Sequence, residues 1–152
     1  MEEHISVLKE EAINFLNVKD GGIYVDATLG FAGHAREVLK RNKKGFLFAF
    51  DKDILACDKA EARLKEIGSN FKIFHKANKD LKETLAQEGV FKGDGVLFDL
   101  GLSSMEIDNK ERGFSYMQDA PLDMRMDTTA TLTAYTVVNT YSKEDLIRIF
   151  RN

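Results

Sequence analysis

The sequence predicts an α/β protein with a mostly parallel sheet and helices on both faces. Short apolar runs alternate with longer amphipathic stretches up to about residue 99, and this alternation is typical of βαβ units. The run from Gly45 to Phe50 is almost continuously apolar, as a strand buried on both faces should be. Right-handed crossovers then place the connecting helices on both faces of the sheet.

The elements follow in chain order. Ser6 is expected to cap a first helix that continues to Leu16, because a serine oxygen can accept from the first helical N–H groups. The expected strands are 23–26, 45–50, 71–74 and 95–100, and the helices between them are 35–41, 54–67 and 81–88. This order predicts a Rossmann-like, doubly wound fold. Such sheets commonly have about five to seven strands, so four strands predict a truncated domain.

The pattern changes between residues 101 and 130, where apolar periodicity is lost. We expect an irregular loop there, and long irregular loops inside compact domains are often functional. Two helices are then expected at 131–141 and 142–150, with Ser142 and Asp145 spaced as in a capping box.

Composition limits the classes of protein. The net charge is −3. This charge counts against RNA binding by the chain alone, because nucleic-acid binders usually carry a basic surface. No apolar run approaches the roughly 18 residues of a membrane span, and no secretory signal is apparent. A lone Cys57 fits a reducing cytoplasm. We therefore expect a cytoplasmic protein with no membrane span.

Two further expectations concern metals and assembly. The histidines His4, His34 and His75 lack the spacing of metal ligands, so no metal site is expected. The uncovered edge of a four-stranded sheet favours self-association, which makes a homo-oligomer an expectation as well.

Acidic residues end three of the expected strands: Asp26, Asp51 and Asp99. The glycine-rich turn Gly30-Phe31-Ala32-Gly33-His34 follows the first strand. In an open α/β sheet the ligand sits beyond the carboxyl ends of the strands, and glycines let the backbone approach it. The alternative is that the turn is only a tight connection that binds nothing.

Asp51 favours a cofactor that contains ribose. It lies 21 residues after Gly30, at the end of the second strand, where a carboxylate can accept from both ribose hydroxyls. A strand-end aspartate can instead cap the next helix, and Asp53 is better placed for that role.

Charge distinguishes two cofactors with a ribose, NAD and S-adenosylmethionine. Ala32 and His34 do not fit the G-x-G-x-x-G pattern that holds a pyrophosphate. Asp26 would repel a pyrophosphate, whereas it suits a cationic sulfonium or an amino group. The residues therefore favour S-adenosylmethionine.

Several different short motifs follow one another along nearly the whole chain. They occupy residues 4–11, 26–30 with 33–34, 50–53, 99–104, 112–115 and 121–127. The pieces Arg-Gly-Phe-Ser and Pro-Leu-Asp-Met-Arg-Met-Asp are not general features of this fold. Together the motifs resemble the family of ribosomal small-subunit RNA cytosine-N4 methyltransferases (RsmH, also called MraW).

The resemblance implies a class I methyltransferase fold, S-adenosylmethionine, and a cytosine in the decoding region of small-subunit ribosomal RNA. It also implies a chain about twice as long, with a helical substrate domain inserted before the sheet is completed. We accordingly expect a cofactor-binding core at 1–130, with its catalytic loop at 99–127. Residues 131–152 would begin the substrate domain.

The resemblance also implies cofactor contacts at Ala32, Gly33, His34, Asp51, Asn78, Asp99 and Glu106. Gly30, in the same glycine-rich turn as Ala32 to His34, is expected to border the cofactor as well. Four positions depart from the family pattern: Ala32 replaces a usual glycine, Asn78 replaces a frequent aromatic residue, and Met105-Glu106 replaces Pro-Gln. A carboxylate at Glu106 could take the amino group of the methyl donor.

The catalytic prediction starts from the cytosine N4 amine, a poor nucleophile whose lone pair is delocalised into the ring. Orientation toward the methyl group lowers the barrier, and hydrogen-bond acceptors on the amine favour its attacking form. We expect Asp99 with Ser103 or Ser104 to supply these acceptors. The alternative is that Asp99 only binds cofactor and the serines only cap a helix.

RNA contacts are expected from Arg112 and Arg125 to phosphates, and from Phe114 or Tyr116 by stacking on an extruded base. The alternatives are that Phe114 and Met124 pack the loop onto the sheet and that Asp123 and Arg125 pair with each other.

The function predicted is S-adenosylmethionine-dependent methylation of cytosine N4 in ribosomal RNA of the small subunit. A truncated cofactor-binding module without catalysis is the main alternative, and an NAD-dependent oxidoreductase is a distant third.

Overall fold

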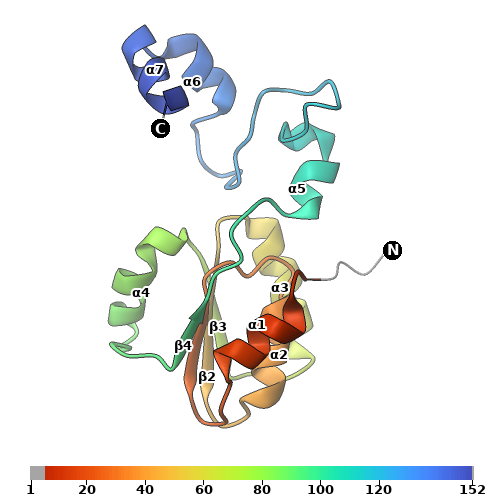
Figure 1. Cartoon of the computed structure of the whole chain (residues 1–152), viewed down its shortest axis with the longest axis vertical. Coiled ribbons are helices and arrows are strands. Elements are labelled where there is room, and N and C mark those ends of the chain that lie inside the picture. The colour runs from red at the N-terminus through yellow and green to blue at the C-terminus, as the bar shows by residue number, and fades with distance from the viewer. Residues whose placement is uncertain (1–5, 152) are drawn as a thin grey trace. The chain divides into compact units, whose positions relative to one another are not determined.

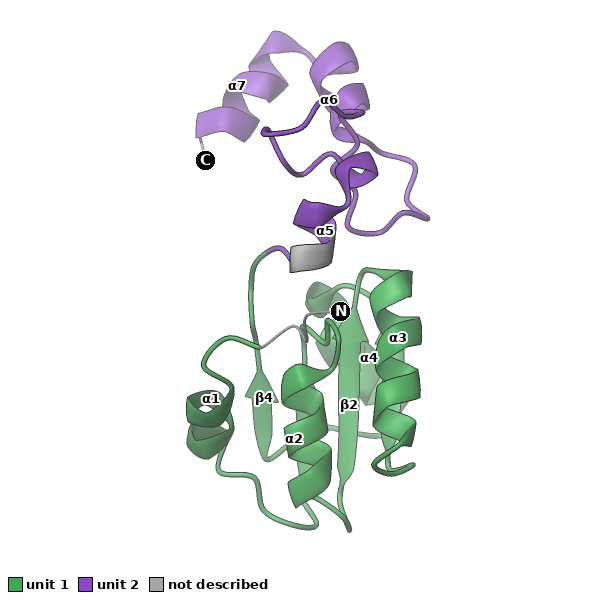
Figure 2. Ribbon diagram, turned by 90° about the vertical axis from the view of Figure 1, so that its right-hand side faces the viewer, with its two compact units in different colours: residues 1–101 green, residues 102–152 purple. Residues whose placement is uncertain are grey.

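The computed structural model describes residues 6–151, apart from the side chains of residues 104 and 105. The chain forms two compact units, Met1–Gly101 (unit 1) and Leu102–Asn152 (unit 2), shown in different colours in Figure 2.

Unit 1 contains a parallel sheet. Its strands are β1 (Ile23–Asp26), β2 (Phe46–Asp51), β3 (Phe71–His75) and β4 (Gly95–Leu97), in the order β3-β2-β1-β4 (Figure 1). β1 pairs in parallel with both β2 and β4. The strand order reverses at β1, and the crevice at such a reversal is where α/β sheets bind ligands.

Helices cover both faces of this sheet, as predicted. They are α1 (Lys9–Leu16), α2 (Gly33–Arg41), α3 (Ile54–Lys65) and α4 (Leu81–Gln87). On one face Ile13, Leu39 and Leu64 from α1, α2 and α3 belong to one buried cluster with strand residues. On the other face Leu85 of α4 packs in a second cluster with Val25, and Figure 1 shows α4 opposite the other three helices. Each fully buried leucine contributes about 1.5–3 kcal/mol.

Two boundaries differ from the prediction. The expected cap of α1 by Ser6 is wrong, because α1 begins at Lys9 after Leu8, whose backbone is left-handed (φ 45°) and whose side chain makes no capping hydrogen bond. β4 ends at Leu97 instead of Leu100. The chain leaves the ladder there because the N–H of Asp99 donates to Thr28 Oγ1 at 2.6 Å. The predicted cap of α3 is confirmed, since Asp53 accepts from Leu55 N.

Unit 2 is more ordered than the predicted loop. It contains α5 (Ser104–Asp108), the 3₁₀ turn η2 (Lys110–Arg112), α6 (Ala134–Thr140) and α7 (Lys143–Arg151), so the expectation of an irregular stretch over 101–130 is wrong in part. At the start of α7 the N–H of Asp145 donates to Ser142 Oγ at 3.1 Å, as the capping spacing predicts.

The division between the units falls after Gly101, whereas the sequence groups residues 102–130 with the core. The carbonyls of Leu122 and Asp123 accept from the N–H groups of Tyr135 and Ala134, at 2.7 and 2.8 Å. These bonds tie the preceding loop to α6. The assignment of residues 131–152 to a substrate domain stays a prediction.

None of the helices within residues 6–151 has the length and apolar character that crossing a membrane requires.

Candidate functional site

Three carboxylates lie at the carboxyl ends of neighbouring strands. Asp26 ends β1, Asp51 ends β2, and Asp99 follows β4 by two residues. Asp26 is buried, and this burial raises its pKa to about 7, with the negative charges of Asp51 and Asp99 adding to the rise against a hydrogen bond from Thr28 N that lowers it. The sequence predicted this convergence. A site with this charge favours a cationic group over an anionic one.

The glycine-rich turn fixes the orientation of Asp51. Gly30 N donates to Asp51 Oδ2 at 2.7 Å, and Asp53 N donates to Asp51 Oδ1 at 2.9 Å. Gly30 itself has φ 48°, and a Cβ built on it would meet nothing within 4 Å. Glycine is therefore favoured by the left-handed backbone, and space remains open beside the turn.

The turn then enters α2 through Ala32, Gly33 and His34. Ala32 precedes α2 with a left-handed backbone, φ 62°, which explains why glycine is the usual residue in the resembled motif. His34 is buried, and its Nε2 donates to the carbonyl of Val7 at 3.0 Å. Its Nδ1 lies 3.8 Å from Asp99 Oδ2.

The participation of Ser6 and Val7 was missed from the sequence. Their only signal was the motif over residues 4–11, of which His4 and Ile5 lie outside the described residues. No local pattern marks a backbone carbonyl as the partner of a histidine 27 positions away.

Asn78 begins the 3₁₀ turn η1 (Asn78–Asp80), three residues beyond His75, the last residue of β3. β3 is the neighbour of β2, so Asn78 lies at the same edge of the sheet as Asp51. His75 Nε2 contacts the carbonyl of Lys52 at 2.8 Å, which links the ends of the two strands.

In unit 2, Ser103 and Glu106 form a capping box at α5. Ser103 N donates to a Glu106 carboxylate oxygen at 2.7 Å, and Glu106 N donates to Ser103 Oγ at 3.2 Å. The alternative that Ser103 caps a helix is thus confirmed, while its catalytic role stays a prediction. Ser104 begins α5, and its side chain lies outside the described residues.

Arg112 is buried beside Glu106, at 3.9 Å between charged atoms. Its guanidinium donates to the carbonyls of Arg125 and Met126, each at 2.9 Å. Arg125 pairs with Asp123 at 2.6 Å, which confirms the alternative predicted from the sequence. Both guanidinium groups thus face oxygens of this chain, and their contacts with RNA stay predictions.

The aromatic residues of the same loop differ in exposure. Phe114 is half-buried, whereas Tyr116 is 96% exposed. Stacking of either ring on a base stays a prediction.

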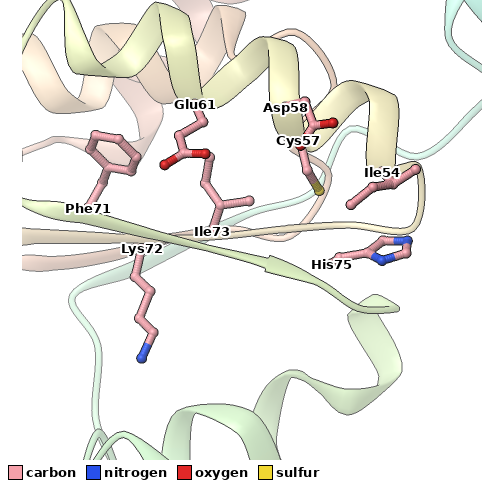
Figure 3. Close-up of a pocket in the computed structure, with 8 residues that line it drawn as sticks. All are labelled: Ile54, Cys57, Asp58, Glu61, Phe71, Lys72, Ile73 and His75. Atoms are coloured by element: carbon pink, nitrogen blue, oxygen red, sulfur yellow. The ribbon is translucent and has the colours of Figure 1, made fainter.

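A separate cavity of about 350 Å³ lies between α3 and β3 (Figure 3). Ile54 and Cys57 from α3 and Phe71 and Ile73 from β3 help to line it. Burial raises the pKa of Cys57 to about 12, so its thiol is protonated at neutral pH and is a poor nucleophile. Figure 3 shows the side chain of Lys72 pointing away from α3, consistent with its 2.6 Å pair with Glu88.

Among residues 6–151 no group of three or more His, Cys, Asp or Glu side chains is arranged to hold an ion.

The strand order, the turn and the three carboxylates together define a Rossmann-like fold, in which ligands generally bind at the carboxyl ends of the strands. The chain belongs to the MraW methylase family, whose model matches residues 1–152, and its fold is that of a Rossmann-like methyltransferase.

Relatives with curated names extend this result. The chain is 51% identical over 150 residues to "Ribosomal RNA small subunit methyltransferase H" of Mycoplasmopsis agalactiae, covering 99% of this chain and 50% of the relative. It is 49% identical over 150 residues to the protein of the same name from Clostridioides difficile, covering 98% and 48%. The chain therefore spans about half the length of these relatives.

Proposed function

We propose that this chain is the cofactor-binding part of an S-adenosylmethionine-dependent methyltransferase that acts on the N4 amine of a cytosine in small-subunit ribosomal RNA. The observation that carries the proposal is the convergence of Asp26, Asp51 and Asp99 around an open glycine-rich turn. The names of the relatives, which specify ribosomal RNA of the small subunit, support the substrate.

The chemistry of the site fits this cofactor better than NAD. S-adenosylmethionine supplies a methyl group on a cationic sulfonium, together with an ammonium group and two ribose hydroxyls. Asp51 has both oxygens positioned by backbone N–H groups, and each oxygen keeps a lone pair for a ribose hydroxyl. A bound cation would favour the charged form of Asp26, whose pKa is raised to about 7, whereas that charged form opposes a pyrophosphate.

The remaining predicted contacts belong to the same proposal. Ala32, Gly33 and His34 border the ligand through the start of α2, and Asn78 borders it from the end of β3. The Glu106 carboxylate accepts from Ser103 N and lies near Arg112. A contact with the donor's amino group would therefore have to be made beside these two partners.

For the transfer step, Asp99 with Ser103 or Ser104 would accept hydrogen bonds from the cytosine amine and hold it in line with the methyl group. Such orientation can account for several kcal/mol, up to roughly 7–11 kcal/mol in the best intramolecular cases. Arg112, Phe114 and Arg125 would contact RNA. The bonds that hold Arg112 and Arg125 to this chain's own carbonyls favour a role in shaping the loop.

The test is calorimetry of S-adenosylmethionine binding to the chain, with NAD as the competing ligand. Asp51→Asn should weaken S-adenosylmethionine binding at least tenfold, because about 1.5–3 kcal/mol is lost with a charged hydrogen-bond acceptor. Asp53→Asn is the matched control: asparagine caps helices as well as aspartate does, so binding should be unchanged. Binding of NAD in preference to S-adenosylmethionine would contradict the proposal.

A second candidate, a cofactor-binding module without catalysis, is favoured by one observation: the chain spans about half the length of its relatives. Methyl transfer to small-subunit ribosomal RNA, measured with a radiolabelled methyl donor, separates the two. Cofactor binding without methyl transfer would support the module.

A further inference from the structure

Three residues before α1, Ser6, Val7 and Leu8, lie against the glycine-rich turn; we call them the N-terminal strap. A Cβ built on Gly33 would collide with Ser6 Oγ and would lie 3.0 Å from Ser6 Cβ. The carbonyl of Val7 accepts from His34 Nε2 at 3.0 Å. Two consecutive residues of the turn therefore contact the strap.

The strap is held by these contacts and not by burial of its apolar side chains. Val7 is 60% and Leu8 is 66% exposed. Leu8 also has a left-handed backbone, φ 45°, which costs an L-residue roughly 1–2 kcal/mol. The contacts of Ser6 and Val7 with the turn offset this strain.

The Val7 carbonyl determines which nitrogen of His34 carries the proton. A carbonyl only accepts hydrogen bonds, so Nε2 must be protonated. In neutral imidazole the other nitrogen, Nδ1, is then an acceptor. The strap thus fixes a tautomer in which a lone pair points toward the Asp99 side of the site.

Nδ1 of His34 and Oδ2 of Asp99 are 3.8 Å apart, too far for a direct hydrogen bond. The backbone of Asp99 is held by its N–H, which donates to Thr28 Oγ1 at 2.6 Å, while its side chain is 40% exposed. Two neighbouring acceptors match a group that has several donors and no acceptor, as a primary ammonium does.

We propose that the N-terminal strap is part of the cofactor site: it holds His34 in the Nε2–H tautomer, so that His34 Nδ1 and the Asp99 carboxylate together bind the α-ammonium of the cofactor. This inference rests on the proposed function. It assigns His34 Nδ1 and Asp99 Oδ2 to the amino-acid end of the ligand, leaves Asp99 Oδ1 for the cytosine amine, and makes Val7 a positioning residue.

Two substitutions of His34 separate the two nitrogens. His34→Gln places an amide N–H near the Nε2 position and removes the Nδ1 acceptor, whereas His34→Asn places an amide near Nδ1 and removes the bond to Val7. The ligands are S-adenosylhomocysteine and 5′-methylthioadenosine, which are both neutral thioethers and differ in the amino-acid group. Calorimetry gives a dissociation constant for each.

The chain should bind both ligands, and His34→Gln should weaken S-adenosylhomocysteine about tenfold or more while changing 5′-methylthioadenosine less than about twofold. Equal changes for both ligands, or no change, would overturn the inference and leave the proposed function standing. Failure of the unsubstituted chain to bind either ligand would overturn both.

The strap is tested separately through Gly33. Gly33→Ala should push Ser6 away, weaken S-adenosylhomocysteine and speed hydrogen exchange of the Ala12 N–H, which donates to the Leu8 carbonyl at 2.8 Å. The double variant Gly33→Ala/Ser6→Gly removes the colliding side chain and should restore both measurements. Without that rescue, the role of the strap is wrong.

Nitrogen-15 NMR of the ligand-free chain gives a readout that needs no cofactor. Because Nε2 of His34 faces the Val7 carbonyl, the spectrum should show a protonated Nε2 and an unprotonated Nδ1, and His34→Asn should lose protection at Ala12. A proton on Nδ1 would overturn the inference even if the cofactor binds.

Discussion

Unit 1 and unit 2 are held together by different forces. In unit 1 most buried side chains are apolar and form two clusters, one on each face of the sheet. Among the described residues of unit 2, the buried side chains are Glu106 and Arg112. Arginine guanidinium groups that donate to carbonyls connect its loop instead.

The two units should therefore be sensitive to different kinds of change. Apolar burial is non-directional and spread over many residues, so unit 1 should tolerate loss of single polar contacts. A buried guanidinium must satisfy several oxygens at fixed angles, so unit 2 should depend on few residues. Apolar side chains of α6 and α7, such as Tyr135 and Phe150, are meanwhile exposed.

The largest expected effect is in unit 2. Arg112→Met should destabilise it by about 3–5 kcal/mol, because the buried Glu106 carboxylate and two carbonyls lose their partner. Hydrogen exchange of the Met124 N–H, which donates to the Arg112 carbonyl at 3.0 Å, measures the loss. Arg148→Met, at an exposed pair, is the control and should change little. A matching loss of protection in unit 1 would contradict the comparison.

Unit 1 should respond to a change in its core. Leu64→Ala removes a fully buried side chain of α3 and should lower the free energy of unfolding by about 2–5 kcal/mol, measured by urea denaturation followed by circular dichroism. Leu55→Ala, on the exposed side of the same helix, should cost much less. If both variants behave alike, the packing assigned to α3 is wrong.

The two units should respond to pH in opposite directions. Asp26 has its pKa raised from 3.8 to about 7, so between these values the folded state binds more protons than the unfolded state. The stability of unit 1 should therefore fall as pH rises through this window, by up to about 1.4 kcal/mol per pH unit. Asp26→Asn should remove this slope in a series of urea titrations.

Asp123 in unit 2 should make stability rise with pH instead of fall. Its hydrogen bonds with the Arg125 side chain hold its pKa below the usual value, so it stabilises unit 2 above about pH 4 and this contribution is lost as pH falls further. Hydrogen exchange at low pH should show unit 2 opening first, and Asp123→Asn should abolish that difference. Parallel pH profiles in the two units would count against both assignments.

The smallest effect is at the turn in unit 1. Ala32→Gly should stabilise the unit by about 1 kcal/mol or less, because glycine adopts the left-handed backbone without strain. Ala35→Gly, one turn later inside α2, should destabilise it by about 1 kcal/mol. Thermal unfolding of the two variants should therefore shift in opposite directions.

Much of unit 1 could be predicted from the sequence because its signals are local. The apolar run at 45–50 predicts β2, and the aspartates at the ends of three strands predict the converging carboxylates, since parallel strands end at one edge of the sheet. The end of β4 could not be predicted, because the bond that draws Asp99 away comes from Thr28, 71 positions earlier.

The candidate site in unit 2 was harder for a physical reason. Arg112 lies in a polar stretch, and polar stretches are typical of exposed loops, so phosphate contact was the natural prediction. Its burial depends on Glu106 and on the carbonyls of Arg125 and Met126. No periodicity in the sequence marks such partners. The pairing of Asp123 with Arg125 could be predicted because the two residues are only two positions apart.

The position of β1 between β2 and β4 sets an order on folding. β1, β2 and β3 pair through short connections, whereas β4 closes a loop of about 70 residues, and long loops cost more entropy to close. Asp99 should therefore reach the site last. A ligand that touches Asp99 binds only the fully paired sheet and favours it by mass action, by about 2.7 kcal/mol at a hundredfold excess over its Kd. The cofactor would then stabilise the last strand to join the sheet.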